Sequence, residues 1–296
     1  MARQLEGVGP RCGCTPSTRR LRVGVELRRL RERTGMTAAE AARAPGTTQG
    51  QMSNIEANRF GVSADRVRTL ARIYGCADQP LVDALAGMAA DRTRGWWEEY
   101  REALPSPHLD LAEMEHHATT LRVAQVINIP GLLQTPDHAR ALFGEAVPAL
   151  APHEIEHRVS HRIKRQVVLF RDHQVPYTAI IHEAALRMQF GGRDVTRGQL
   201  RHLVETSDQP HVTLRVIPFD GTSFPTAGHG LDYAHGPATA LDTAQPDTSH
   251  GSELIDIARK LETYRLVLDR MERATLKPTT SRDLIHRIAK RILVEP

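Results

Sequence analysis

Residues 35–59, GMTAAEAARAPGTTQGQMSNIEANR, decide the fold, because they predict two short helices joined by a tight turn. Thr37 is a candidate N-cap with Glu40 three residues later, and Thr48 repeats that spacing with Gln51, so a capping box opens each helix. The Pro-Gly pair between them ends the first helix, since proline lacks an amide donor and glycine tolerates positive φ. This pattern predicts a helix-turn-helix.

The second helix of the pair carries the candidate binding surface. Met52 and Ile55 are expected to point inward, which leaves an uncharged, amide-rich face toward solvent. The residues of that face are Gln49, Gly50, Gln51, Ser53 and Asn54. Glutamine and asparagine side chains can pair with adenine edges in the major groove, and glycine lets the backbone approach closely. The sequence therefore predicts that the chain binds double-stranded DNA.

The flanking residues extend this helical unit to residues 23–77 and resemble a known family. A first helix is expected to end at Gly35, and a fourth helix is expected to start after Ser63 and stop at Gly75. The order of helix, turn, amide-rich helix, Glu-x-Asn-Arg and capped helix resembles the Cro and phage-repressor (XRE-type) helix-turn-helix family.

The resemblance implies roles for individual side chains. It implies base reading by Gln49, Gly50 and Asn54, and phosphate contacts from Thr48, Gln51 and Arg59. It also implies a structural ion pair between Arg31 and Glu56. The family often carries a polar phosphate-contacting residue where this chain has Ala38, and Thr37 at the start of the same helix is a further DNA-binding candidate.

The charge distribution agrees with a DNA-binding N-terminal part. Residues 1–77 contain 14 arginines, no lysine and 6 acidic residues, a net charge of +8. The remainder contains 25 basic and 29 acidic residues, a net charge of −4. A basic segment attracts phosphates and releases counterions, which is the sequence-independent part of DNA affinity. A solvated arginine face would explain the charge alone, but not the charge together with the helix pattern.

Length and composition bound the remaining possibilities. A chain of 296 residues is long enough for about two domains. No apolar run approaches the roughly 20 residues that span a bilayer, and no signal-peptide core is present, so we expect a cytoplasmic protein that is nucleoid-associated when bound to DNA. Cys12, Cys14 and Cys76 are too few for a disulfide framework. Residues 1–22 are expected to form a disordered basic tail.

A domain boundary is expected near Asp91, after a fifth helix at residues 80–90. The DNA-binding domain then covers residues 23–90, and a mixed α/β body covers residues 91–296. The fold class is an all-α helix-turn-helix domain followed by an α/β (α+β) domain. Strands are expected at residues 123–129, 177–182 and 212–217; helices at residues 152–170, 183–190, 197–207, 253–276 and 281–293; and a Gly-rich stretch at residues 220–251.

The body also resembles a family. WWEEYREALP, INIPGLLQTPDHARAL, RVSHRIKRQVVL, IIHEAALRMQFGG and VTLRVIPF occur in this order in actinobacterial WhiJ-like regulators, which join a Cro-type helix-turn-helix to an uncharacterised C-terminal domain. The resemblance implies a regulator whose body senses a small molecule or a protein, and relatives are often described as antitoxin-like. Family members usually carry a strand pair where residues 220–251 of this chain are looser.

Several histidines have spacings that could suit a metal site. His153, His157 and His161 share one helix face, where a solvated face is favoured over a zinc site. The spacing His229-x2-Asp232-x2-His235 matches no established metal site. No nucleophile elbow or phosphate-binding glycine loop is present. We therefore expect no enzyme activity, no metal and no cofactor.

Two functions remain open on the sequence. The first is a DNA-binding regulator whose C-terminal domain senses a small molecule, with Trp96, Trp97 and Tyr100 as candidates for the ligand site. The second is an antitoxin-like protein that holds a small partner protein and autoregulates its operon. In either case a homodimer on a pseudo-palindromic operator is expected, since one head reads only a few base pairs. The apolar stripe of residues 253–276 is the candidate dimer interface.

Overall fold

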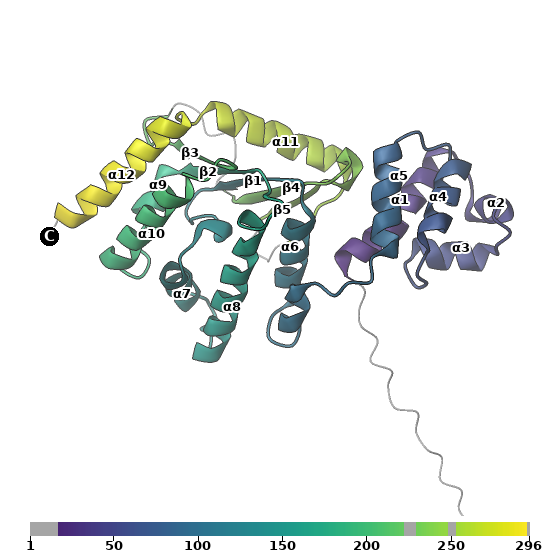
Figure 1. The fold of residues 1–296 in the computed structure, drawn as a ribbon, viewed down its shortest axis with the longest axis horizontal. Coiled ribbons are helices and arrows are strands. Elements are labelled where there is room, and N and C mark those ends of the chain that lie inside the picture. Colours follow the sequence, from purple (N-terminus) through teal and green to yellow (C-terminus); the bar gives the residue numbers. More distant parts are fainter. Residues whose placement is uncertain (1–16, 222–228, 248–252, 295–296) are drawn as a thin grey trace, which may run out of the picture. The chain divides into compact units, whose positions relative to one another are not determined.

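The structure is a computed structural model that describes residues 17–221, 229–247 and 253–294. The chain divides into two compact units between Asp91 and Arg92. Figure 1 shows a first unit made of helices and a second unit built around a sheet. This arrangement confirms the predicted fold class, an all-α domain followed by an α+β domain.

The first unit contains five helices within the described residues: α1 (Thr18–Arg33), α2 (Ala38–Arg43), α3 (Gln49–Glu56), α4 (Ala64–Ile73) and α5 (Gln79–Ala90). Both predicted capping boxes are confirmed, at Thr37 with Glu40 and at Thr48 with Gln51. The predicted tail over residues 1–22 is wrong at its C-terminal end, because α1 begins at Thr18. The hydroxyl of Ser17 caps this helix by accepting from the amide of Arg20. The rest of the predicted tail, residues 1–16, lies outside the described residues.

The helices α1 and α3 approach each other most closely at Gly24. A Cβ atom on Gly24 would lie 2.6 Å from the carbonyl oxygen of Glu56 and 2.7 Å from that of Ile55. Side chains essentially never come this close to backbone, so the glycine allows the two helix backbones to meet. The buried core around this contact includes Val23, Leu27, Met52, Val67 and Leu70.

Replacing Gly24 with alanine is therefore expected to destabilise the first unit by about 1–3 kcal/mol, because backbone must move to admit the methyl group. Gly87 in α5 is a matched control, since no atom lies within 4 Å of its added Cβ. There the same substitution should be neutral or stabilise the helix by up to about 1 kcal/mol. Thermal unfolding followed by far-ultraviolet circular dichroism measures both. Equal effects at the two glycines would contradict the close approach.

The second unit contains one five-stranded mixed sheet in the order β3-β2-β1-β4-β5. The strands are β1 (Thr120–Gln125), β2 (Tyr177–His182), β3 (Val212–Ile217), β4 (Leu231–His235) and β5 (Thr243–Pro246). β1, β2 and β3 are parallel, with Val123 opposite Ala179 and Ala179 opposite Leu214. β4 lies antiparallel beside β1, and β5 lies antiparallel beside β4 at the edge of the sheet.

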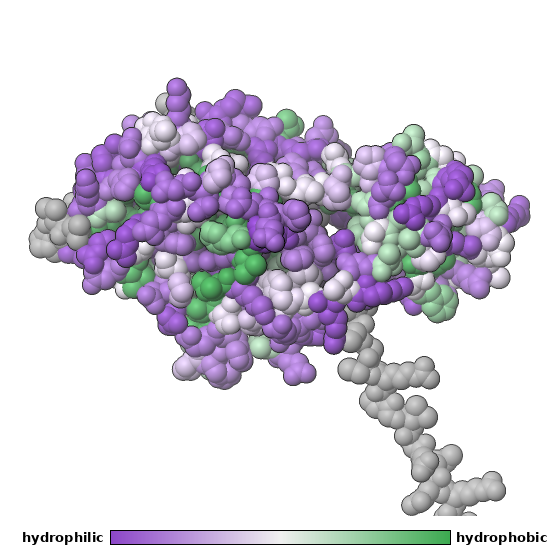
Figure 2. Space-filling model, viewed as in Figure 1, coloured by the Kyte–Doolittle hydropathy of each residue, from purple (hydrophilic) through white to green (hydrophobic). Residues whose placement is uncertain are grey.

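Helices cover both faces of this sheet. They are α6 (Ser106–His117), α7 (Pro136–Gly144), α8 (Pro152–Arg165), α9 (Glu183–Arg187), α10 (Arg193–Thr206), α11 (Ala258–Arg273) and α12 (Pro278–Val294), with short 3-10 turns at Trp96–Tyr100, Gly131–Leu133, Gln166–Leu169 and Thr239–Leu241. The larger core joins one face of the sheet to α9, α10 and α12. The smaller core joins the opposite face to α11 (Figure 1). In Figure 2 the visible surface of this unit is mainly hydrophilic, with hydrophobic side chains gathered beside α8.

The parallel strands β1, β2 and β3 were predicted from the sequence, whereas the antiparallel strands β4 and β5 were not. β2 and β3 have the predicted bounds, and β1 lies a few residues before the predicted 123–129. The stretch 220–251 was expected to be loose, yet it contains β4 and β5, so the predicted departure from the WhiJ-like pattern is wrong there. Residues 222–228 and 248–252 of this stretch lie outside the described residues. The strands were missed because they are short and mix Asp, His and Pro with few β-branched residues.

Candidate nucleic-acid interface

The helix α3 is held in place by one ion pair and one apolar contact surface. Arg31 of α1 donates to both carboxylate oxygens of Glu56, at 2.6 and 2.8 Å, and a third nitrogen donates to the carbonyl oxygen of Met36 at 2.7 Å. This confirms the predicted Arg31–Glu56 pair, and both residues are buried. Ala41 and Ala42 of α2 are also buried, and their small side chains let α2 pack against α3. The pair therefore fixes α3 relative to both α1 and the turn.

The outward face of α3 has the composition that the sequence predicts. Gln49, Gly50, Gln51 and Ser53 are exposed, and Asn54 is half-buried. Met52 is buried as predicted, but Ile55 is only half-buried, and Glu56 is the deeper of the two. Space around Gly50 is open, since an added Cβ would meet only the Thr48 hydroxyl, at 4.0 Å. The face presents amide groups and one glycine to solvent, as base reading in a major groove requires.

The capping residues Gln51 and Thr37 differ in whether they retain a hydrogen-bond donor that could contact a phosphate. Gln51 accepts from the Thr48 amide through Oε1, which leaves its Nε2 group able to donate. The Thr37 hydroxyl, by contrast, donates to Glu40 at 2.8 Å and accepts from the Glu40 amide. Hydrogen bonds from Thr37 also lower the pKa of Glu40, so a carboxylate sits beside this hydroxyl. Thr37 is therefore the predicted DNA-binding residue least suited to contact a phosphate.

Two exposed arginines flank α3. Arg43, at the end of α2, lies near Glu40 and helps to lower the pKa of that carboxyl. Arg59, after α3, has no ion pair with an acidic residue among the residues that the structure describes. Many arginines of α1 are instead paired, as Arg22 is with Glu26 and Arg28 with Glu32. The basic excess is thus most available beside α3. Arg43 was not singled out from the sequence, although its place in the last turn before Pro45-Gly46 was a usable signal.

The turn after α3 depends on Asn58. Its φ of 52° lies in the left-handed region, which asparagine tolerates better than most residues. Its side-chain amide donates to the carbonyl oxygen of Leu21 in α1. The Asn of the Glu-x-Asn-Arg motif therefore closes the turn that brings Arg59 to the end of α3.

The candidate ligand-binding rings of the second unit, Trp96, Trp97 and Tyr100, are packed against neighbouring helices. Trp97 is buried, with its ring centroid 5.1 Å from that of His116. Trp96 lies 5.4 Å from His161, and the Tyr100 hydroxyl is 2.8 Å from the Ser160 hydroxyl. The predicted aromatic helix is a five-residue 3-10 turn, whose rings dock onto α6 and α8. A ligand role for these rings stays a prediction.

The three histidines of α8 do not form the solvated face that was favoured. His153 and His157 are exposed, but His161 is buried between the rings of Trp96, Tyr100 and His108. Burial and the nearby Arg165 lower the pKa of His161 to about 3, so this ring is neutral and serves as packing. Among the described residues no group of three His, Cys, Asp or Glu could hold a metal ion.

The residues of the spacing His229-x2-Asp232-x2-His235 do not share one face, because side chains alternate along a strand. Asp232 and His235 are three residues apart in β4, so their side chains point to opposite faces of the sheet. His235 lies 3.3 Å from Asp242, near Tyr233, on the face that carries α11. Asp232 points instead toward Glu115, Arg165 and Asp247.

Asp232 belongs to a polar cluster that also contains Glu115, Arg165 and Asp247. Arg165 of α8 donates to both carboxylate oxygens of Glu115 of α6, at 2.7 and 2.6 Å, and both side chains are almost fully buried. Burial, reinforced by the charges of Asp247 and Glu115, raises the pKa of Asp232 to about 8. The Tyr177 hydroxyl is buried among these groups without a hydrogen-bond partner in the described structure.

The raised pKa of Asp232 predicts a pH dependence of stability. Between the ordinary pKa of about 4 and the folded value, only the unfolded chain releases this proton, so stability falls as pH rises through that range. Asp232→Asn cannot ionise, so its melting temperature should exceed that of the unmodified protein by more at pH 8.5 than at pH 5. A difference that is the same at both pH values would contradict the assignment.

Comparisons with known proteins agree with this geometry. Residues 22–85 match a helix-turn-helix domain, which supports DNA binding by the first unit. The chain is accordingly a helix-turn-helix DNA-binding regulator by class. Residues 109–287, more than half of the chain, match a domain of unknown function (DUF5753), and the chain belongs to that family. Searches of curated proteins and of solved structures each found no match.

In the described parts of the chain, no helix is both long enough and apolar enough to cross a bilayer.

Proposed function

We propose that this protein is a sequence-specific transcriptional regulator that reads DNA through α3. The observation that carries the proposal is the solvent-facing set of amides on α3 beside an open glycine. These side chains can hydrogen-bond base edges, while Arg43 and Arg59 provide phosphate attraction next to them. The matched helix-turn-helix domain supports the same function.

The proposal includes a homodimer on a pseudo-palindromic operator, because two heads double the number of bases read. Most of the apolar stripe of residues 253–276, the candidate dimer interface, is buried inside the second unit. Leu261, Leu268 and Met271 of α11 are buried against the sheet. On this helix and its N-cap, Ile257 and Leu266 remain exposed, so an α11 interface would rest on them and not on the stripe.

We propose further that the second unit senses a small molecule and thereby acts by binding, without catalysis. A cavity of about 430 Å³ in this unit favours a small molecule over a protein partner. Both edge strands of the sheet already use backbone groups that an added strand would need. The amide of Leu276 donates to the carbonyl oxygen of Val216 in β3, and Ala244 of β5 pairs with Ile255. An antitoxin-like role therefore remains the second candidate.

Selection from a random pool of duplex DNA tests the proposed function. The full-length protein should enrich one sequence, with two related half-sites about one helical turn apart if the dimer forms. Light scattering on the free and DNA-bound protein gives the number of chains on that site. Binding should weaken steeply with salt, as phosphate contacts require. Failure to enrich any sequence would contradict a sequence-specific regulator.

A further inference from the structure

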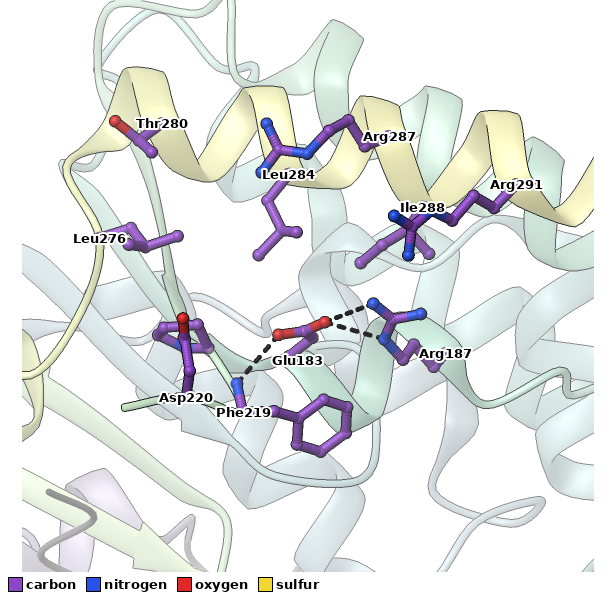
Figure 3. Close-up of a pocket in the computed structure, with 11 residues that line it drawn as sticks. Glu183, Arg187, Phe219, Asp220, Leu276, Thr280, Leu284, Arg287, Ile288 and Arg291 are labelled. Atoms are coloured by element: carbon purple, nitrogen blue, oxygen red, sulfur yellow. Dashed lines mark hydrogen bonds and ion pairs between the residues drawn. The ribbon is translucent and has the colours of Figure 1, made fainter. Parts of the chain in front are cut away.

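The second unit contains a cavity between α9, α12 and the segment that follows β3. Its volume is about 430 Å³, within the usual range for small-molecule sites. Figure 3 shows α12 along one side of the cavity, with Glu183 and Arg187 of α9 and Phe219 facing it from the other. All of these residues belong to the second unit.

Three arginines line this cavity, and two of them are uncompensated. Arg287 and Arg291 are one turn apart on α12, so they share a helix face, and both are exposed. Neither has an acidic partner in the part of the chain that the structure describes. Arg187 faces them and donates to Glu183 through Nε and Nη2, which neutralises this third cation. The end of the cavity near Arg291 therefore carries an excess of positive charge.

The acidic groups of the cavity do not cancel this excess. Glu183 is committed to Arg187 and also accepts from the amide of Phe219 at 2.9 Å. Among the described residues, the only other carboxylate lining the cavity is Asp220, which Figure 3 draws apart from Arg291, toward the Leu276 end. The cavity thus has a cationic end formed by guanidinium groups, which bind carboxylates and phosphates through paired hydrogen bonds.

The rest of the lining is apolar. Leu284 and Ile288 project from the same side of α12 that carries Arg287 and Arg291, and Leu276 precedes the helix (Figure 3). The ring of Phe219 is 59% exposed, an unusual position for a phenylalanine, and the Arg187 guanidinium lies 5.8 Å from its centroid. An inorganic anion would leave this apolar surface in water, whereas an organic anion would cover it.

We propose that this cavity binds a small organic anion with an apolar body, a carboxylate or a phosphate monoester. The anionic group pairs with Arg287 and Arg291, and the apolar body lies against Leu284, Ile288 and Phe219. That this anion is the effector of the regulator rests on the proposed sensing function of the second unit. That the cavity binds such an anion does not depend on DNA binding.

Isothermal titration calorimetry on the full-length protein without DNA tests the site with one apolar body and four head groups. The probes are 4-phenylbutyrate, 4-phenylbutyl phosphate, 4-phenylbutanol and 4-phenylbutylamine. Either anion, or both, should bind saturably and about tenfold or more tightly than the alcohol and the amine, because a hydrogen-bonded ion pair is lost. The two anions compared with each other distinguish a carboxylate from a phosphate ligand. No saturable binding of either anion, or equal binding of all four probes, would overturn the proposal.

Single-charge variants of α12 locate the binding. Arg287→Ala and Arg291→Ala should each weaken the anion about tenfold, whereas Lys290→Ala removes one charge from an exposed position outside the cavity and should have little effect. Equal losses in all three variants would mean nonspecific attraction and would overturn the site. Unchanged circular dichroism melting shows that each variant is folded. Anion binding without any selected DNA sequence would contradict only the regulator; selected DNA without anion binding would contradict only this inference.

Discussion

Replacing Glu56 with alanine is expected to destabilise the first unit by about 3–5 kcal/mol, since it leaves the buried guanidinium of Arg31 without its partner. This is a large part of the 5–15 kcal/mol that typically stabilises a domain. Because Glu56 ends α3 on the side away from solvent, the loss should appear in stability before it appears in DNA sequence preference.

Hydrogen exchange of peptides from α1 and α3 measures this effect in the full-length protein, with the second unit as an internal reference. Asp83→Ala is the control, because Asp83 is exposed on α5 and lies no closer than 4.0 Å to its partner Arg68. Its exchange should be nearly unchanged. Normal exchange in Glu56→Ala, together with an altered DNA preference, would mean that Glu56 belongs to the reading surface.

Replacing Arg165 with methionine is expected to destabilise the second unit by a similar amount, about 3–5 kcal/mol. The change strands the buried Glu115 near Asp232 and Asp247, so three carboxyl groups share one region without the nearest cation. Both tryptophans, Trp96 and Trp97, lie in this unit, and Trp97 packs against His116 of the same helix as Glu115, so tryptophan fluorescence follows urea unfolding of this unit.

The double variant Glu115→Leu/Arg165→Met should recover most of the loss, since replacing both partners of a buried pair by apolar groups is often neutral. Arg201→Met is the control on an exposed surface, where the side chain is 76% accessible and pairs only loosely at 3.9 Å. A double variant no more stable than Arg165→Met would show that packing, and not the stranded charge, causes the loss.

The sequence predicted the first unit well because its signals are local. Capping boxes, the Pro-Gly stop and inward Met52 are decided within a few residues, and the structure has each of them. The start of α1 was missed, since only Ser17 marks it within an arginine-rich segment. The Arg31–Glu56 pair joins residues 25 positions apart and was predictable only through the resemblance to the Cro family.

Features that depend on distant contacts were less predictable. β4 is recognisable only once it is paired with β1, because Val123 lies opposite Asp232 across more than 100 residues. The periodicity of residues 253–276 correctly predicted an apolar face on α11 but could not say that the sheet covers it. Arg287 and Arg291 have a visible i, i+4 spacing, yet the cavity they line depends on Phe219 and Arg187 arriving from other elements.

The central claim is that Gln49 and Asn54 read bases, and one comparison of affinities tests it. Fluorescence anisotropy at a fixed salt concentration gives the affinity of the protein, Gln49→Ala and Asn54→Ala for the selected duplex and for a scrambled duplex. Each variant should lose about 1–3 kcal/mol on the selected duplex and almost nothing on the scrambled one. Equal losses on both duplexes would contradict base reading and would make these side chains phosphate contacts.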